Sequence, residues 1–434
     1  MGHHHHKINR RTFLGQASCA AVGMTTLMST MLNLKAVNAM AGLELPYLQQ
    51  GPFDDYKAMV CILLSGGADS YNMLIPNNTA TYQEYANTRS NQAIPQADLI
   101  PINPTNTAGQ EFGLHPSMPH MASIFDSGNL AFVSNVGTLI EPTTKTGVYN
   151  GSSKLPLGLY SHADQVAHWQ TSVPHDRVAT GWGGKMADLL NAMPNGPDRN
   201  QDISMNISLS GSNIYQTGNS SVEFAIDRDN GAQSILGYNQ TDWLSGQLRR
   251  EAVDNVIDAQ YQDIFKQTFA NTMATGRNGA QHLIEAFNNA TPLTTEFEMC
   301  NTDPWSCLST ALEMVAKTIN VRDAVGAKRQ IFFVEYGGWD HHDELLGSQM
   351  AMLNKVDKAL NSFNNAITEM GLQEQVTTFS ISEFARTLTS NGNGTDHGWG
   401  GNMFVMGGAV DGQKIYGEYP ALALDANLEL GNGV

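Results

Sequence analysis

Three short segments rich in β-branched, aliphatic and aromatic residues constrain the fold more than any other feature of this chain. They are Ala58–Leu64, Ile331–Tyr336 and Val376–Ser382. Nearly continuous apolar runs of this length are typical of strands that are buried on both faces, as in a parallel sheet. A strand with one face in water would instead alternate apolar and polar residues. The chain therefore needs helices on both faces of its sheet.

Other segments supply the rest of an alternating pattern. Further strands are predicted at Leu130–Asn135, Ile203–Leu209 and Met403–Met406, and helices at Pro116–Asp126, His162–Thr171, Glu251 to about Asn289, Ser309–Val321 and Asp343–Glu369. Strands that alternate with helices predict a mainly parallel sheet covered on both faces. About 390 residues could form one or two domains. We expect one α/β domain over residues 42–434, a three-layer α/β/α sandwich.

Acidic and imidazole side chains follow two of the buried strands directly. Asp69 comes after the first strand through the glycine turn Gly66-Gly67, and Asp340 and His342 come after the fourth strand. Because the carboxyl ends of parallel strands meet at one edge of a sheet, we expect these side chains to converge there. With one residue between them, Asp340 and His342 can face the same ion while His341 points away. The alternative for Asp69 is a helix cap or a loop residue.

A second ligand motif lies near the C-terminal end, in Gly394-Thr395-Asp396-His397-Gly398. Asp396 and His397 offer a carboxylate oxygen and an imidazole nitrogen, and the flanking glycines let the backbone bring both to one point. A short pair of this kind also occurs in solvated turns. Three such positions at one sheet edge predict a centre for one or two divalent metal ions, either zinc, manganese or calcium.

Glu383 and Arg386 follow the fifth strand. A glutamate this close to an arginine is commonly a structural ion pair. We interpret Glu383 as a further metal ligand, and Arg386 as a guanidinium that can form paired hydrogen bonds with a phosphate or sulfate group.

Ser161 opens a predicted helix, directly before His162. A serine in this position is commonly an N-cap. It is also where the helix dipole favours an alkoxide and binds the anion that the alkoxide attacks, which makes Ser161 the candidate nucleophile. His162 or His168 could then protonate a leaving group. His115 is interpreted as a capping or core residue.

The N-terminal segment has the pattern of an export signal. Residues 3–6 are four histidines that are typical of a purification tag. Arg10 and Arg11 precede a moderately apolar, small-residue segment and an alanine-rich stretch that ends near Ala41. This pattern predicts a twin-arginine (Tat) signal over residues 1–41, export by the Tat translocase, and a periplasmic or secreted protein. A short amphipathic helix is the alternative.

Charge and cysteine content agree with that location. The chain has 24 basic and 41 acidic residues, a formal charge of -17, which disfavours nucleic acid and anionic membranes as partners. After the signal, no stretch has the roughly 18 uninterrupted apolar residues of a membrane span. Cys300 and Cys307 lie close together in the exported chain, so we expect a disulfide between them, and Cys61 is expected to be a buried thiol.

The ordered motifs resemble a known family. Gly66-Gly67-Ala68-Asp69, Leu114-His115-Pro116, Asn135-Val136-Gly137, Ser161-His162, Thr180-Gly181-Trp182, Asp340-x-His342, Ser382-Glu383-Phe384 and Gly394-Thr395-Asp396-His397-Gly398 resemble the Tat-exported domain-of-unknown-function family 1501. That family is grouped with the alkaline phosphatase and sulfatase superfamily. The resemblance covers nearly the whole mature chain and implies an alkaline phosphatase-like α/β/α sandwich with one or two metal ions.

Residue roles follow from the resemblance. It implies that Asp69 matches the first metal-binding Asp, that Ser161 falls at the nucleophile, and that the other ligands are Asp340, His342, Asp396 and His397. The pattern is broken where Tyr160 replaces an expected Arg before Ser-His and where Ala385 replaces a Gly before Arg386. The chain also ends before the final helix that the family would lead us to expect, which suggests a C-terminal truncation.

These features together predict an exported, metal-dependent hydrolase of small anionic esters with Ser161 as nucleophile. Phosphate esters are favoured over sulfate esters, because Ser161-His162-Ala163 lacks the Cys/Ser-x-Pro-x-Arg context of formylglycine-dependent sulfatases. The alternative is a noncatalytic exported protein of the same fold that binds a surface polymer or a partner. A lipase-like enzyme is disfavoured, since no Gly-x-Ser-x-Gly turn follows a strand.

Overall fold

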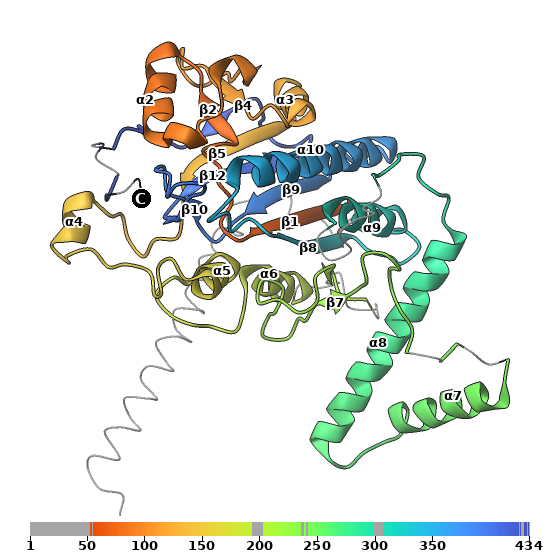
Figure 1. Ribbon diagram of the computed structural model, residues 1–434. Coiled ribbons are helices and arrows are strands. Elements are labelled where there is room, and N and C mark those ends of the chain that lie inside the picture. Colours follow the sequence, from red (N-terminus) through yellow and green to blue (C-terminus); the bar gives the residue numbers. More distant parts are fainter. Residues whose placement is uncertain are drawn as a thin grey trace, which may run out of the picture. The chain divides into compact units, whose positions relative to one another are not determined.

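An eight-stranded sheet forms the centre of the protein (Figure 1). The computed structural model describes residues 53, 55–192, 203–235, 238–239, 242–298, 307–424, 426, 429–431 and 433, and Asp55–Val434 groups into one compact unit. The predicted export signal and Cys300 lie outside the described residues. Cys307 is disulfide-bonded, and its pairing with Cys300 stays a prediction, whereas Cys61 is a free, buried thiol.

The sheet is mainly parallel, as the sequence predicts. Its strand order is β13 (Ile415–Tyr416), β5 (Leu130–Val136), β12 (Gly401–Met406), β9 (Val376–Ile381), β1 (Lys57–Ser65), β8 (Arg329–Gly337), β6 (Asn206–Ser208) and β7 (Phe224–Ala225). Strand β12 pairs antiparallel with both β5 and β9, and the other neighbours pair in parallel. The carboxyl ends of β1, β8 and β9 therefore lie at the same edge.

Helices cover both faces of the sheet, because the central strands are apolar on both. Val60 and Ile62 of β1 belong to the core cluster shared with α3 (Pro119–Asp126), α9 (Leu308–Asn320) and α10 (Leu345–Glu369). Cys61 and Leu63, which point the opposite way, pack in the cluster of α5 (His162–Thr171) and α6 (Trp182–Asn191). All four side chains are at most 2% exposed. The three-layer α/β/α class is confirmed.

The structure corrects the long predicted helix from Glu251 to Asn289. It is two helices, α7 (Leu244–Ile257) and α8 (Ile264–Asn289). The Asp263 carboxylate accepts the backbone N–H of Lys266 at 2.9 Å and so caps the start of α8. An N-cap aspartate ends the continuity of the helical pattern, since its own backbone is extended.

Several smaller elements were not predicted from the sequence. A three-stranded sheet joins β2 (Leu74–Pro76), β4 (Phe112–Leu114) and β3 (Ile100–Ile102), and the additional helices include α2 (Thr79–Arg89) and α4 (Lys145–Tyr149). Among the helices that the structure describes, none combines the length and apolarity required to cross a bilayer.

Candidate metal centre

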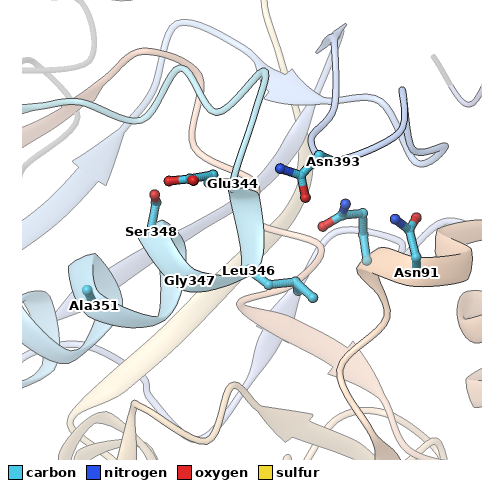
Figure 2. Close-up of a pocket in the computed structure, with 8 residues that line it drawn as sticks. Asn91, Glu344, Leu346, Gly347, Ser348, Ala351 and Asn393 are labelled. Carbon is cyan, nitrogen blue, oxygen red and sulfur yellow. The ribbon is translucent and has the colours of Figure 1, made fainter.

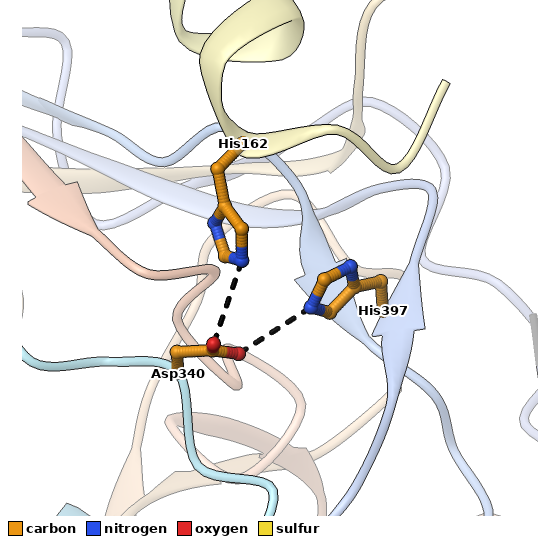
Figure 3. A group of neighbouring side chains, drawn as sticks. All are labelled: His162, Asp340 and His397. Carbon is orange, nitrogen blue, oxygen red and sulfur yellow. Dashed lines mark hydrogen bonds and ion pairs between the residues drawn. The ribbon is translucent and has the colours of Figure 1, made fainter. Parts of the chain in front are cut away.

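Two histidines and an aspartate from three separate segments meet beyond the carboxyl ends of the strands. His162 is the first residue of α5, Asp340 follows β8, and His397 begins the short strand β11 (His397–Gly398), which pairs with β10 (Ala385–Arg386). One ligand atom of each residue lies within 4.8 Å of the others. Both rings point at the carboxylate, from 3.5 Å for His162 Nε2 and 3.4 Å for His397 Nε2 (Figure 3).

His342 is a fourth member of this group. Its Nε2 atom lies 3.1 Å from Asp340 Oδ1 and 3.1 Å from His397 Nε2. The structure thus brings together four of the residues that the sequence singled out, namely His162, Asp340, His342 and His397.

Hydrogen bonds on the outer side of each ring assign the protons. His162 Nδ1 lies 2.8 Å from Glu383 Oε1, and His397 Nδ1 lies 3.0 Å from the carbonyl oxygen of Tyr160. A carbonyl oxygen or an ionised carboxylate can only accept, so each Nδ1 carries the hydrogen. When the ring is neutral, its Nε2 atom therefore presents a lone pair to Asp340.

The same reasoning applies to His342, whose Nδ1 lies 3.1 Å from Asp396 Oδ1. Three Nε2 lone pairs and the Asp340 carboxylate then face one another, and none of the four groups has a hydrogen to share. Such an arrangement is repulsive until a cation or added protons lie between the groups. Nitrogen and oxygen donors backed by hydrogen-bonded Nδ1 atoms are typical of a transition-metal site.

The charges around the centre also favour a cation. Three carboxylates, those of Asp340, Glu383 and Asp396, surround the rings, and Arg386 supplies one guanidinium. Two negative charges are left when the imidazoles are neutral. Burial raises the pKa of Asp340, but the hydrogen bond and charge of Arg386 outweigh burial and hold that pKa below its ordinary value. Burial also lowers the pKa of His397, which keeps the ring neutral.

Arg386 is occupied by the protein itself. Its side chain is fully buried, and Nη1 donates to Asp340 Oδ1 at 2.6 Å, Nε donates to Thr395 Oγ1 at 3.2 Å, and Nη2 donates to the Thr395 carbonyl. The guanidinium therefore fixes the carboxylate, and the fork that the sequence suggested for a phosphate is directed to Asp340 and Thr395.

Glu383 and Asp396, which the sequence predicts as metal ligands, lie behind the histidine rings. Glu383 is buried, and its Oε1 accepts the Gly66 N–H at 2.7 Å in addition to the ring of His162. Each carboxylate contacts the Nδ1 atom of a histidine, on the side of the ring that faces away from Asp340. A group in this position orients a metal ligand and does not bind the metal itself. Their chemical type could be read from the sequence, but this difference could not, because it depends on which side of the ring each carboxylate occupies.

Asp69 is not part of the four-residue group. It is fully buried and its Oδ2 forms an ion pair with Arg89, at the end of α2. Its Oδ1 has no hydrogen-bond partner among the described residues. Gly66 nevertheless holds the loop that leads to Asp69 against the centre, since a Cβ at this residue would lie 2.5 Å from the backbone nitrogen of Asp340.

Ser161 caps α5, as the simpler interpretation of the sequence suggests. Its Oγ accepts the N–H of Asp164 at 3.4 Å, which is long for a hydrogen bond. His168 and His341 are both buried, and within the described residues neither has a partner for its ring nitrogens. Neither ring therefore makes a hydrogen bond to the four-residue group.

The described surface has several hollows, among them two that differ in chemical character. One is lined by Asn91, Gln92, Glu344, Leu346, Gly347, Ser348, Ala351 and Asn393 and measures about 640 Å³ (Figure 2). Its described lining has a single carboxylate, Glu344, and no imidazole, so it lacks the side chains that would bind a metal ion. The other, of about 380 Å³, borders the centre through Tyr160, Arg386 and Gly398.

Fold and site define an α/β/α sandwich protein with a histidine-rich candidate cation site at the carboxyl edge of its sheet. The chain belongs to the family described as protein of unknown function (DUF1501), whose model matches residues 56–429. The family expected from the motifs is confirmed. A comparison with curated proteins gives no match.

Comparison with solved structures gives remote similarities. The lipoteichoic acid synthase LtaP from Listeria monocytogenes is 8% identical, with a TM-score of 0.32, over 81% of this chain and 65% of that chain, just under two thirds of its length. The alkaline phosphatase from the Antarctic bacterium TAB5 is 10% identical, with a TM-score of 0.27, over 82% of this chain and 92% of that chain. A variant of the alkaline phosphatase PafA is 12% identical, with a TM-score of 0.28, over 78% of this chain and 64% of that chain.

Proposed function

We propose that this protein is an exported, metal-dependent hydrolase of phosphate esters, with sulfate esters as weaker substrates. The observation that carries the proposal is the convergence of three Nε2 atoms, from His162, His342 and His397, on the carboxylate of Asp340. Tat export, predicted from residues outside the described range, would place the enzyme in the periplasm or the medium.

The donor set fits zinc better than the other predicted ions. Three imidazole nitrogens and one carboxylate oxygen suit Zn²⁺, whereas Ca²⁺ takes six to eight oxygen ligands. Manganese, a harder ion, prefers a larger share of oxygen. A bound divalent ion would act as a Lewis acid on the nonbridging oxygens of a phosphate ester.

The residues around the ion would orient its ligands and the substrate. Arg386 holds Asp340, and Glu383 holds His162, which preorganises the donor set. Ser161, at the N-terminal end of α5, is the proposed nucleophile, and the N–H groups there favour the anionic ester. Its Oγ would attack phosphorus, the alcohol would leave with a proton, and water would release the phosphate from the serine.

The second candidate is a noncatalytic protein that binds a metal and a surface polymer or partner. Two observations favour it: the hydroxyl of Ser161 serves as a helix cap, and all three nitrogens of Arg386 donate within the protein. Both candidate functions require the metal centre, but only the hydrolase turns over a substrate.

Metal content tests what the candidates share. Tag-free protein purified without chelator is expected to retain zinc by elemental mass spectrometry, at one or two ions per chain. Asp340→Ala and His397→Ala are expected to lose it, while His282→Gln, at an exposed position on α8, should retain it. An equal metal content in all four proteins would contradict the proposed centre.

Turnover then separates the candidates. With zinc bound, 4-nitrophenyl phosphate should be hydrolysed faster than 4-nitrophenyl sulfate. Ser161→Asn retains a good N-cap but has no hydroxyl, so it should lose turnover without losing stability. If the zinc-loaded protein hydrolyses neither ester, the noncatalytic candidate stands; if Ser161→Asn is fully active, the nucleophile is a different group.

A further inference from the structure

A cavity of about 380 Å³ adjoins the metal centre and is not used by any step above. Its walls come from four parts of the chain: Tyr71 after β1, the segment from the end of β5 to α5, the residues around β10 and β11, and the last residues of the described chain. Two of its lining residues contact the centre directly, because the Tyr160 carbonyl accepts from His397 and the Arg386 guanidinium donates to Asp340. A molecule in the cavity would therefore lie against residues that hold two of the candidate ligands, His397 and Asp340.

The cavity presents mostly apolar surface. Leucine, proline, valine and tryptophan side chains form its walls, among them Leu139, Leu155, Leu159 and Trp399. The indole of Trp399 is fixed by a 2.9 Å hydrogen bond from Nε1 to the Thr138 carbonyl. A rigid aromatic wall of this kind suits an apolar ring as its neighbour.

Some of the polar groups in the lining are satisfied within the protein. Glu429 accepts the N–H groups of Gly431 and Gly433 at 2.7 and 2.9 Å, and its other oxygen lies 3.6 Å from the ammonium group of Lys145. Thr144 caps α4 through the N–H of Gly147. A sugar or nucleotide would have to bury many hydroxyl groups against walls that are mostly leucine, proline, valine and tryptophan, which is unfavourable.

Two leucines remain partly uncovered in this lining. Leu139 is 37% exposed and Leu155 is 41% exposed. Large apolar side chains at a cavity beside a polar centre are typical of a binding site with one apolar and one polar end.

We propose that this cavity binds the organic group of the substrate, and that this group is apolar and aromatic, the size of a substituted phenyl or a naphthyl ring. The inference rests on the proposed hydrolase function for its substrate, with the phosphate at the metal centre and the ring against Trp399. It predicts a preference for aryl phosphates over sugar, glycerol and nucleoside phosphates.

The experiment uses a double variant, Leu139→Ser with Leu155→Ser, which removes apolar surface from the cavity at partly exposed positions. Leu244→Ser together with Leu248→Ser is the matched control, since both leucines are exposed on α7. Binding of 2-naphthol, the product alcohol without phosphate, is measured by titration calorimetry. Hydrolysis of 2-naphthyl phosphate and of glycerol phosphate is measured in parallel.

Saturable 2-naphthol binding is expected in the wild type, in the control and in Asp340→Ala, with affinity about tenfold or more weaker in the cavity variant. The ratio of kcat/KM for naphthyl phosphate over glycerol phosphate should fall by a similar factor. Absent naphthol binding, or equal affinity in the cavity variant and the control, overturns the inference whatever the enzyme hydrolyses. Loss of metal-dependent hydrolysis alone, with naphthol binding as expected, overturns the proposed function and leaves the cavity as an aryl-binding site.

Discussion

Each imidazole of the metal centre is held by an acceptor at Nδ1, and the acceptors differ in chemistry. Glu383 holds His162, Asp396 holds His342, and a backbone carbonyl holds His397. Asp and His after strands could be recognised from the sequence, because these residue types are metal ligands and strand ends converge. Which carboxylate binds an ion and which binds a ring depends on sub-ångström placement, and no sequence spacing encodes it.

Asp69 illustrates the same limit at one residue. Its partner Arg89 lies twenty positions later, at the end of an unpredicted helix. Nothing in the local sequence of either residue indicates this pairing, since it depends on where α2 packs.

Replacing Glu383 with Gln is expected to weaken zinc binding by about 10- to 100-fold. The neutral amide keeps the shape of the side chain, but removes the charge that raises the basicity of His162. The dissociation constant is measured by competition with a chromophoric chelator. Glu285→Gln, at an exposed position on α8, is the control and should bind zinc as the wild type does. Equal affinities in the two variants would show that Glu383 has no orienting role.

His115 should make the folded state sensitive to acid. Burial lowers the pKa of this residue to about 4, and its Nδ1 accepts the N–H of Ser117 at 3.1 Å. The unfolded chain binds a proton near pH 6.5, the ordinary value, while the folded state stays neutral down to about pH 4. Stability contributed by the neutral ring is therefore present above pH 6.5 and is lost as pH falls toward 4, by at most ~3 kcal/mol.

The His115→Asn variant tests this expectation, because the amide oxygen can still accept from Ser117 while the side chain does not titrate. Urea unfolding at several values between pH 7 and pH 4 should give a flatter dependence for the variant. A slope equal to that of the wild type would assign the acid sensitivity to other groups.

At the scale of elements, strands β1, β8 and β9 could be predicted because they are long and apolar on both faces. Strand β12 was also found in the sequence, but its antiparallel insertion between β5 and β9 was not. A short run of apolar residues indicates that a strand is buried, but it does not indicate whether the strand is parallel or antiparallel to its neighbours. The division of α7 from α8 was missed because the cap at Asp263 interrupts a pattern that otherwise continues.

The loop after β1 should tolerate no side chain at Gly66. This glycine has a φ of 126°, and a Cβ would lie 2.5 Å from the Asp340 nitrogen and 2.7 Å from the Trp339 nitrogen. Gly66→Ala therefore has to push the two loops apart, and we expect a loss of ~3 kcal/mol in unfolding free energy with a loss of bound zinc. Gly128→Ala is the matched control, with a φ of 84° and nothing within 4 Å of the new methyl group. Its expected cost is about 1 kcal/mol, from backbone strain alone, with zinc retained. Equal losses of unfolding free energy in the two variants would mean that the Asp340 loop can move away from the added methyl group at little energetic cost.

At the scale of the whole molecule, the four candidate ligands come from positions 162, 340, 342 and 397, and so join α5 to the loop after β8 and to strand β11. Unfolding must separate all three segments, and the unfolded chain has no preformed site, so metal binding should stabilise the entire unit. Free zinc at about 100 times its dissociation constant is expected to add ~2.7 kcal/mol to the unfolding free energy and to raise the melting temperature by roughly 5 °C. Scanning calorimetry with zinc and with excess chelator measures the difference. The His397→Ala variant should melt at the same temperature in both conditions, because one of the three segments no longer contributes a ligand. A zinc-dependent rise of equal size in that variant would place the stabilising ion at a different site, and a rise in neither protein would mean that the converging nitrogens bind protons in place of a metal.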